Sequence, residues 1–94
     1  MERRDLLLAS LRQAQQLRAT GPATDAFLRW RDDADEMLAD LVGAGHRLRL
    51  EFREAAGPYG PQDAEGLQVD GPRGLRQRLE RGSAVLRRLL AEGA

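Results

Sequence analysis

The clearest hydrophobic pattern in the chain lies in residues 24–42, where apolar side chains recur at steps of three and four. This spacing places them on one side of a helix with 3.6 residues per turn. The acidic residues of the same segment fall on the remaining surface. The pattern predicts an amphipathic helix whose apolar stripe begins with two aromatic residues and packs onto other helices. The stripe consists of Phe27, Trp30, Ala34, Met37, Leu38 and Leu41.

A second helix is predicted before this one, over residues 2–19. Gly21 suits the left-handed position that follows a helix, and Pro22 cannot continue one. The helix over residues 24–42 then begins near Ala23 or Thr24, with Thr24 as its expected N-cap, and ends at Gly43. Because the connection between the two helices is short, we expect them to pack antiparallel.

Residues 46–55 carry a mixed signal. Apolar and charged residues alternate from His46 onwards, which is the period of a half-buried strand. However, the chain offers no second strand for it to pair with, and Leu48 and Phe52 are four apart, as in a helix. We predict a short helix, and the alternative is an edge strand of a dimer.

Residues 57–74 contain five glycines and three prolines, which is typical of a long flexible loop. Pro72 is then expected to open the last helix. Gly82 interrupts that helix at a cost of about 1 kcal/mol relative to alanine. Such a glycine is expected to let a neighbouring helix come close.

The predicted fold is therefore an all-α bundle of three long helices and one short helix, with a long Gly/Pro-rich loop before the last helix. We expect the 94 residues to form a single helical domain, residues 1–94, in which residues 57–74 are the flexible loop. The absence of cysteine excludes disulfides and thiolate metal sites. No apolar run is long enough to span a bilayer, so we expect a cytoplasmic protein without a membrane partner.

The zero net charge hides an uneven distribution. Residues 24–42 contain two arginines against six acids, a net charge of −4, and residues 72–94 contain six arginines against two acids, a net charge of +4. The simplest expectation is that the acidic helix and the basic last helix attract each other within the bundle. The alternative is an arginine face reserved for phosphate.

Candidate chemistry is sparse, and we expect no enzyme and no cofactor. His46 is the single histidine, and nothing near it in the sequence orients it as a base, so a helix-terminal or solvent-facing position is expected. Asp32, Glu36 and Asp40 share a helical face, but a divalent metal needs further ligands from other helices. We expect this face to be solvated or paired with arginine.

A nucleic-acid or phosphate-binding role through the last helix is the alternative function. Its arginines could grip phosphates, although no aromatic residues interleave with them for base stacking. The candidates are Arg73, Arg76, Arg87 and Arg88.

The spacing Phe27-x-x-Trp30, the helix that follows it, Gly43 and a downstream Phe52 are similar to a small helical accessory module of bacterial defence proteins. In those proteins the module often precedes TIR-like or other nucleotide-binding effector domains. The sequence departs from the module at Val42, which stands where an aromatic residue is usual. The resemblance implies an adaptor or accessory role. The last helix shares the pattern through Leu79, Gly82, Leu86, Leu89 and Leu90.

The preferred function is therefore a non-enzymatic interaction module that self-associates or docks a partner protein. Apolar positions at the two ends of the chain exceed what one helix face needs, and aromatic residues are frequent binding anchors. For Phe27 and Trp30 the alternative is a place in the core. The interface candidates are Leu7, Leu11, Phe27, Trp30, Leu86, Leu89 and Leu90.

Overall fold

The computed structural model describes residues 3–21, 23–57 and 63–92, and every secondary-structure element in these ranges is a helix. The four helices are α1 (Arg3–Thr20), α2 (Thr24–Val42), α3 (Arg47–Ala55) and α4 (Asp63–Ala91). The predicted all-α bundle is thus confirmed. Residues 46–55 were the ambiguous segment, and α3 settles them as a helix rather than a strand.

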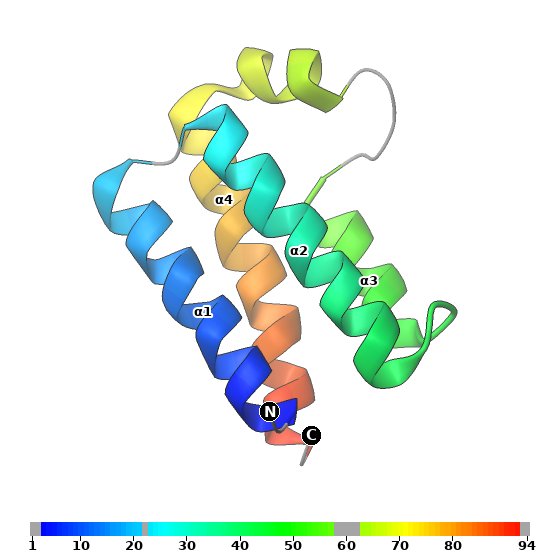
Figure 1. Cartoon of the computed structure of the whole chain (residues 1–94). Coiled ribbons are helices and arrows are strands. Elements are labelled where there is room, and N and C mark those ends of the chain that lie inside the picture. Colours follow the sequence, from blue (N-terminus) through cyan, green and yellow to red (C-terminus); the bar gives the residue numbers. More distant parts are fainter. Residues whose placement is uncertain (1–2, 22, 58–62, 93–94) are drawn as a thin grey trace.

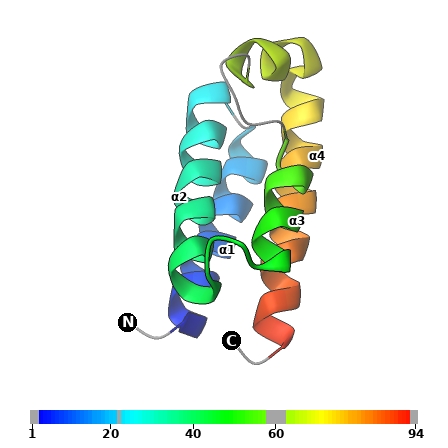
Figure 2. The ribbon, with the colours of Figure 1, turned by 90° about the vertical axis from the view of Figure 1, so that its right-hand side faces the viewer.

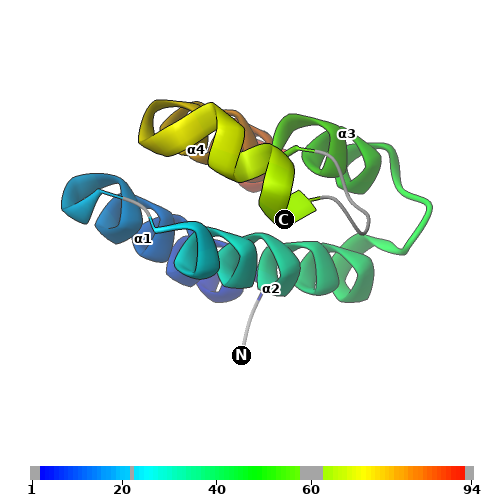
Figure 3. The same ribbon diagram turned by 90° about the horizontal axis from the view of Figure 1, so that it is seen from above.

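The helices form two layers, with α1 beside α2 and α3 beside α4 (Figures 1 and 3). Successive helices α1, α2 and α3 alternate in direction, so the expected antiparallel packing of α1 and α2 is confirmed (Figure 1). The main part of α4 runs antiparallel to α1 and ends beside its first turns (Figures 1 and 2). α2 and α4 each pack against all three other helices.

The last helix begins earlier than the sequence predicts. α4 starts at Asp63, so residues 63–74 are helical where a flexible loop was expected; residues 58–62 lie outside the described part of the chain. In Figure 1 the ribbon changes direction in the yellow stretch around residue 70, which contains Gly71 and Pro72. Proline inside a helix removes one backbone hydrogen bond and kinks the axis. The sequence signal at Pro72 therefore marks a bend within α4 instead of its first turn.

The stripe predicted on α2 is the centre of the core. Phe27, Trp30, Ala34 and Leu38 are buried, and Met37 and Leu41 are partly buried and pack against them. The other helices add mostly leucine and alanine, as the composition requires. In the described part of the chain, the buried apolar residues outside α2 are Leu7, Ala14, Leu48, Phe52, Ala56, Leu75, Leu79, Val85, Leu86 and Leu89, with Ala56 at the C-cap of α3.

Trp30 joins three helices through one side chain. The centroid of its ring lies 5.6 Å from that of Phe52, in an edge-to-face arrangement, and 6.1 Å from that of Phe27. Its indole N–H donates a 3.0 Å hydrogen bond to the backbone carbonyl of Ser10 in α1. Aromatic pairs at these distances contribute about 1 kcal/mol each beyond the area they bury. The hydrogen bond removes the cost of burying a free indole N–H.

Gly82 allows α4 to approach these rings closely, as the sequence predicts. A Cβ atom at this position would lie 3.0 Å from Phe52 Cε2 and 3.1 Å from Trp30 Cη2. Gly82 itself is buried. The rings of Trp30 and Phe52 thus occupy the space where other residues would place a side chain.

Glycine and histidine mark the helix ends. Gly21 and Gly43 have φ values of 82° and 103°, so both take the conformation that glycine tolerates best. His46 is the N-cap of α3, and its Nδ1 accepts a 3.1 Å hydrogen bond from the Leu48 N–H. The helix-terminal position expected for His46 is thus confirmed.

The predicted N-cap of α2 is wrong by one residue. Ala23, with φ −82° and ψ 150°, is the N-cap, and it makes no side-chain capping hydrogen bond. The reason is that the Ala23 carbonyl already accepts the first hydrogen bond of the helix, from the Phe27 N–H at 3.0 Å. Thr24 is therefore the first helical residue.

We predict that Gly82→Val lowers the free energy of unfolding by about 1–3 kcal/mol, the usual cost of overpacking a core. The new methyl groups would displace two rings, one of which is fixed by its hydrogen bond to α1. Ala84→Val on the exposed side of α4 is the matched control, with an expected loss of about 0.5 kcal/mol from helix propensity alone. Urea unfolding followed by circular dichroism measures both, and equal losses would contradict the close approach at Gly82.

Candidate functional site

The structure divides the seven interface candidates into two groups. Leu7, Phe27, Trp30, Leu86 and Leu89 are no more than 5% exposed and belong to the core. The remaining two, Leu11 and Leu90, are partly buried and pack against it. For Phe27 and Trp30 the core alternative is confirmed, and the hypothesis that they anchor an interface is not compatible with their burial in a single chain. Among the side chains that the structure describes, Leu50 on α3 is the large apolar one that is exposed, by 53%.

The four phosphate candidates do not form one cluster. The side chain of Arg73 lies outside the described part of the structure. Arg76 and Arg87 are exposed on the side of α4 that faces α1: the Arg76 guanidinium lies beside Gly21, and Arg87 lines a hollow against α1. Arg88 turns instead to α3 and pairs with Glu51 at 3.0 Å. Two of the four thus share a surface.

The surface hollow between α1 and α4, which we call the α1–α4 notch, has a volume of about 20 Å³. One water molecule needs roughly 10–15 Å³ measured in this way, so the notch accommodates about one small group. An ion pair of 2.9 Å between Arg18 and Glu80 crosses it. The notch is lined by Ala14, Gln15 and Arg18 of α1 and by Leu79, Glu80, Ser83 and Arg87 of α4.

Ser83 gives the notch its buried polar group. The residue is only 4% exposed, and within the described part of the chain its hydroxyl has no hydrogen-bond partner. Arg87 is exposed at the same notch and has no ion-pair partner among the described residues. Sequence reasoning missed Ser83, Gln15 and Arg18 as members of one site. They are brought together only by the antiparallel packing of α1 against α4, which no local sequence signal predicts.

The outer face of α2 carries a continuous set of carboxylates, which we call the acidic stripe. They lie opposite the buried stripe, because residues at steps of three and four share a helical face. Arg29 is the one basic side chain among them, and Asp32 is held by Arg31. In the described part of the chain the other four have no ion-pair partner. The acidic stripe consists of the exposed residues Asp25, Asp32, Asp33, Glu36 and Asp40.

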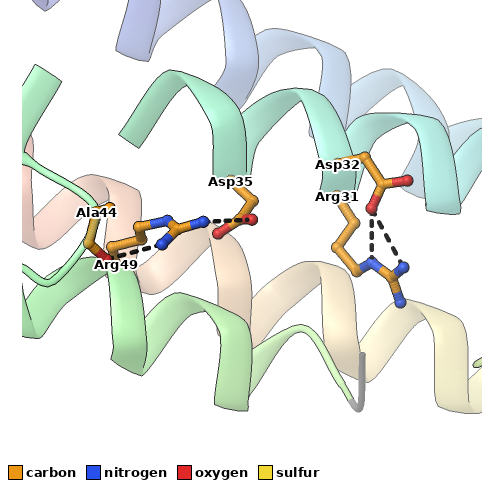
Figure 4. A network of polar contacts seen from close by, with 5 residues as sticks. All are labelled: Arg31, Asp32, Asp35, Ala44 and Arg49. Atoms are coloured by element: carbon orange, nitrogen blue, oxygen red, sulfur yellow. Dashed lines mark hydrogen bonds and ion pairs between the residues drawn. The ribbon is translucent and has the colours of Figure 1, made fainter. Parts of the chain in front are cut away.

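The ion pairs inside the bundle pass through α3. Arg49 of α3 binds Asp35 of α2 at 3.1 Å and donates a 2.7 Å hydrogen bond to the carbonyl of Ala44 (Figure 4). On its other side α3 presents Glu51 to Arg88 of α4. The expected attraction between the acidic and basic helices is therefore not direct among the side chains that the structure describes. α3, which packs against both helices, carries one partner for each.

Arg31 is the one arginine among the described side chains that is almost fully buried, with 4% of its surface exposed. Its Nε and Nη2 both lie 3.2 Å from Oδ1 of Asp32 (Figure 4). A buried guanidinium needs such partners, because removing one from water without them costs several kcal/mol. Asp32 itself is 62% exposed, so this pair links the core to the acidic stripe.

The described residues form neither a metal site nor a membrane-spanning helix. Within residues 3–21, 23–57 and 63–92, no three histidine or carboxylate side chains come together closely enough to hold a metal ion. Nor does any described helix combine the length and the apolar character that crossing a bilayer requires.

We predict that Asp35→Ala lowers the free energy of unfolding by about 2 kcal/mol, because it leaves the Arg49 guanidinium, 17% exposed, without its counter-charge. Oδ1 of Asp35 and Nε of Arg49 already lack hydrogen-bond partners among the described residues. Replacing both residues by leucine should therefore recover most of the loss. The exposed Arg18–Glu80 pair is the control: a double-mutant cycle in chemical unfolding should give it a coupling energy below about 1 kcal/mol. A coupling as small at Asp35–Arg49 would contradict the prediction.

Comparison with protein-family models, with curated proteins and with solved structures finds no match to this chain. The similarity to a helical module of bacterial defence proteins therefore rests on the residues of the chain alone. The structure places Trp30, Phe52 and Gly82, which carry part of that similarity, in one contact at the centre of the bundle. Such a contact stabilises the fold. Because its residues are buried, a binding function depends on other residues, which lie at the surface.

Proposed function

We propose that the chain is a cytoplasmic, non-enzymatic interaction module, which acts by self-association or by docking a partner protein. The observation that supports this is the separation of charge over its surface. The acidic stripe covers the outside of α2, while Arg76 and Arg87 are exposed on α4 along the border with α1. Opposite charges on separate faces favour oriented association, since they steer partners and fix their register.

The apolar candidates contribute less to this function than the sequence implies. Most of them are buried, so the contact is expected to be polar, with Leu50, Leu11 and Leu90 as small apolar additions. Polar interfaces of this kind weaken as salt is added, because the Debye length falls from about 10 Å at 0.1 M to about 3 Å at 1 M. By its resemblance to the defence-associated module, we propose an accessory role beside an effector protein.

We predict that the tagged protein recovers a stoichiometric protein partner, or further copies of itself, from its native lysate at low salt. Neutralising the stripe with Asp33→Asn, Glu36→Gln and Asp40→Asn, or the α4 arginines with Arg76→Gln and Arg87→Gln, should reduce recovery at least about tenfold. Arg47→Gln with Glu54→Gln on the exposed side of α3 is the control and should leave recovery unchanged. Mass spectrometry and the native mass of the untagged complex provide the measurement. Recovery of the chain alone, as a monomer at every salt concentration, would contradict the proposal.

Nucleic-acid binding is the second candidate function, and one observation favours it. Arg76 and Arg87 are exposed, and neither has an ion-pair partner among the described residues. Both are therefore available to a phosphate backbone. Against this, Arg88 is occupied by Glu51, and Glu80 places a negative charge at the same border.

If the alternative holds, fluorescence anisotropy with labelled single-stranded and duplex oligonucleotides should show binding that weakens as salt rises. The slope of log K against log salt should fall by about one for each phosphate-contacting arginine that is replaced, with Arg76→Gln and Arg87→Gln as the variants. Arg47→Gln is the control. At 20 mM salt the Debye length is roughly 20–30 Å, so charges on the protein and the phosphates are only weakly screened. Absence of binding under this condition would exclude the function.

A further inference from the structure

The α1–α4 notch brings together hydrogen-bond donors that suit an anion. Ser83, a residue only 4% exposed, offers a hydroxyl that has no hydrogen-bond partner among the described side chains. Arg87 and Gln15 add a guanidinium and an amide at the same place, and both are exposed. Arg18 is already bound to Glu80. The remaining donors favour an oxygen that carries negative charge.

The size of the notch limits what it can take. At about 20 Å³ it holds one group the size of a water molecule, which excludes the burial of a nucleotide or a cofactor. One carboxylate at the end of a side chain fits this limit, because a single oxygen can enter while the rest of its chain stays outside. A side chain of that kind has to be presented by another surface.

We propose that the notch receives a carboxylate from the acidic stripe of a second copy of this chain. The proposal rests on the interaction function above and names the partner. Ser83 and Gln15 would donate hydrogen bonds to the entering oxygen, and Arg87 would pair with its charge. Neighbouring stripe residues would then lie along the exposed arginine side of α4.

The charges of the molecule argue for a second copy as the occupant. The acidic stripe combines five carboxylates with one arginine, and Asp33, Glu36 and Asp40 have no ion-pair partner in the described part of the chain. A run from Asp25 to Asp40 spans about 22 Å along a helix, and the run from Arg76 to Arg87 spans about 16 Å. The two surfaces are thus of similar length and opposite sign.

The fold prevents one chain from satisfying both surfaces by itself. The acidic stripe lies on the exposed face of α2, and the notch is lined by residues of α1 and α4. The zero net charge means that two copies do not repel each other overall. A contact between different faces is heterologous, so each added copy leaves one stripe and one notch free. The expected product is a ladder of oligomers that grows with concentration.

Sedimentation velocity of the full chain tests this at 20 mM and 500 mM NaCl. We expect the average mass to rise above the 10.4 kDa of one chain at low salt and to return to it at high salt. A stripe variant (Asp33→Asn, Glu36→Gln, Asp40→Asn) and a notch variant (Ser83→Ala, Arg87→Gln) should each weaken association at least about tenfold. Circular dichroism confirms that both variants keep the helical fold.

Mixing the two variants gives the sharpest result. The stripe variant keeps its notch and the notch variant keeps its stripe, so an equal mixture should form a species of two chains and nothing larger. The matched controls remove the same charge elsewhere: Arg81→Gln for the notch, and Asp5→Asn with Glu54→Gln and Glu92→Gln for the stripe. The controls should associate as the original chain does.

Three outcomes would overturn the proposal: a single chain at every concentration at 20 mM salt, association that the variants leave unchanged, or a mixture that forms no two-chain species. The function proposed above is judged separately. If the original chain does not self-associate but recovers another protein from lysate, and the notch variant loses that protein, the second copy is the wrong partner and the interaction function stands. If nothing is recovered either, both fail.

Discussion

The fold depends on the close approach of α4 to two aromatic rings. Trp30 and Phe52 come within about 3 Å of the position where Gly82 would carry a Cβ atom, and Trp30 also bonds to the backbone of α1. One tryptophan thereby sets the positions of three partner helices around α2. In a core otherwise made of leucine and alanine, which pack without strong directional preference, these contacts fix a unique arrangement. The register of α4 against α1 follows from them, and that register creates the α1–α4 notch.

Electrostatics in the bundle follow from the same arrangement. α3 is short, but it packs against both the acidic α2 and the basic α4 and gives Arg49 to one and Glu51 to the other. These internal ion pairs neutralise few of the charged side chains of α2 and α4. The acidic stripe and the arginines of α4 beside α1 therefore remain exposed on the surface. The net charge of zero is therefore the sum of an acidic face and a basic face. The molecule is neutral overall, but its charges are separated over its surface.

The sequence predicts the helices well where one face is apolar, because a 3.6-residue period records which side meets the core. This explains why the α2 stripe is confirmed. Residues 46–55 alternate as a strand would, and α3 is predicted only from the four-residue step between Leu48 and Phe52 and from the lack of a second strand. Prediction from the sequence fails where composition replaces periodicity: glycines and prolines in residues 63–74 indicate a loop, yet α4 runs through them and bends near Pro72. It also fails at the notch, since Ser83 and Gln15 belong to helices far apart in the chain and their meeting depends on helix packing.

The burial of the apolar candidates changes the kind of recognition that this surface can support. A helix end rich in leucine suggests an apolar interface, but Leu7, Leu86 and Leu89 are used to close the core. What remains outside is mostly charge, and exposed charge pairs contribute less than about 1 kcal/mol each. Binding through such a surface needs several pairs at once and one site where a group is desolvated. The notch is lined by the Ser83 hydroxyl and the Arg87 guanidinium, and neither group has a partner among the described residues. A single carboxylate would gain more there than in an ordinary surface pair.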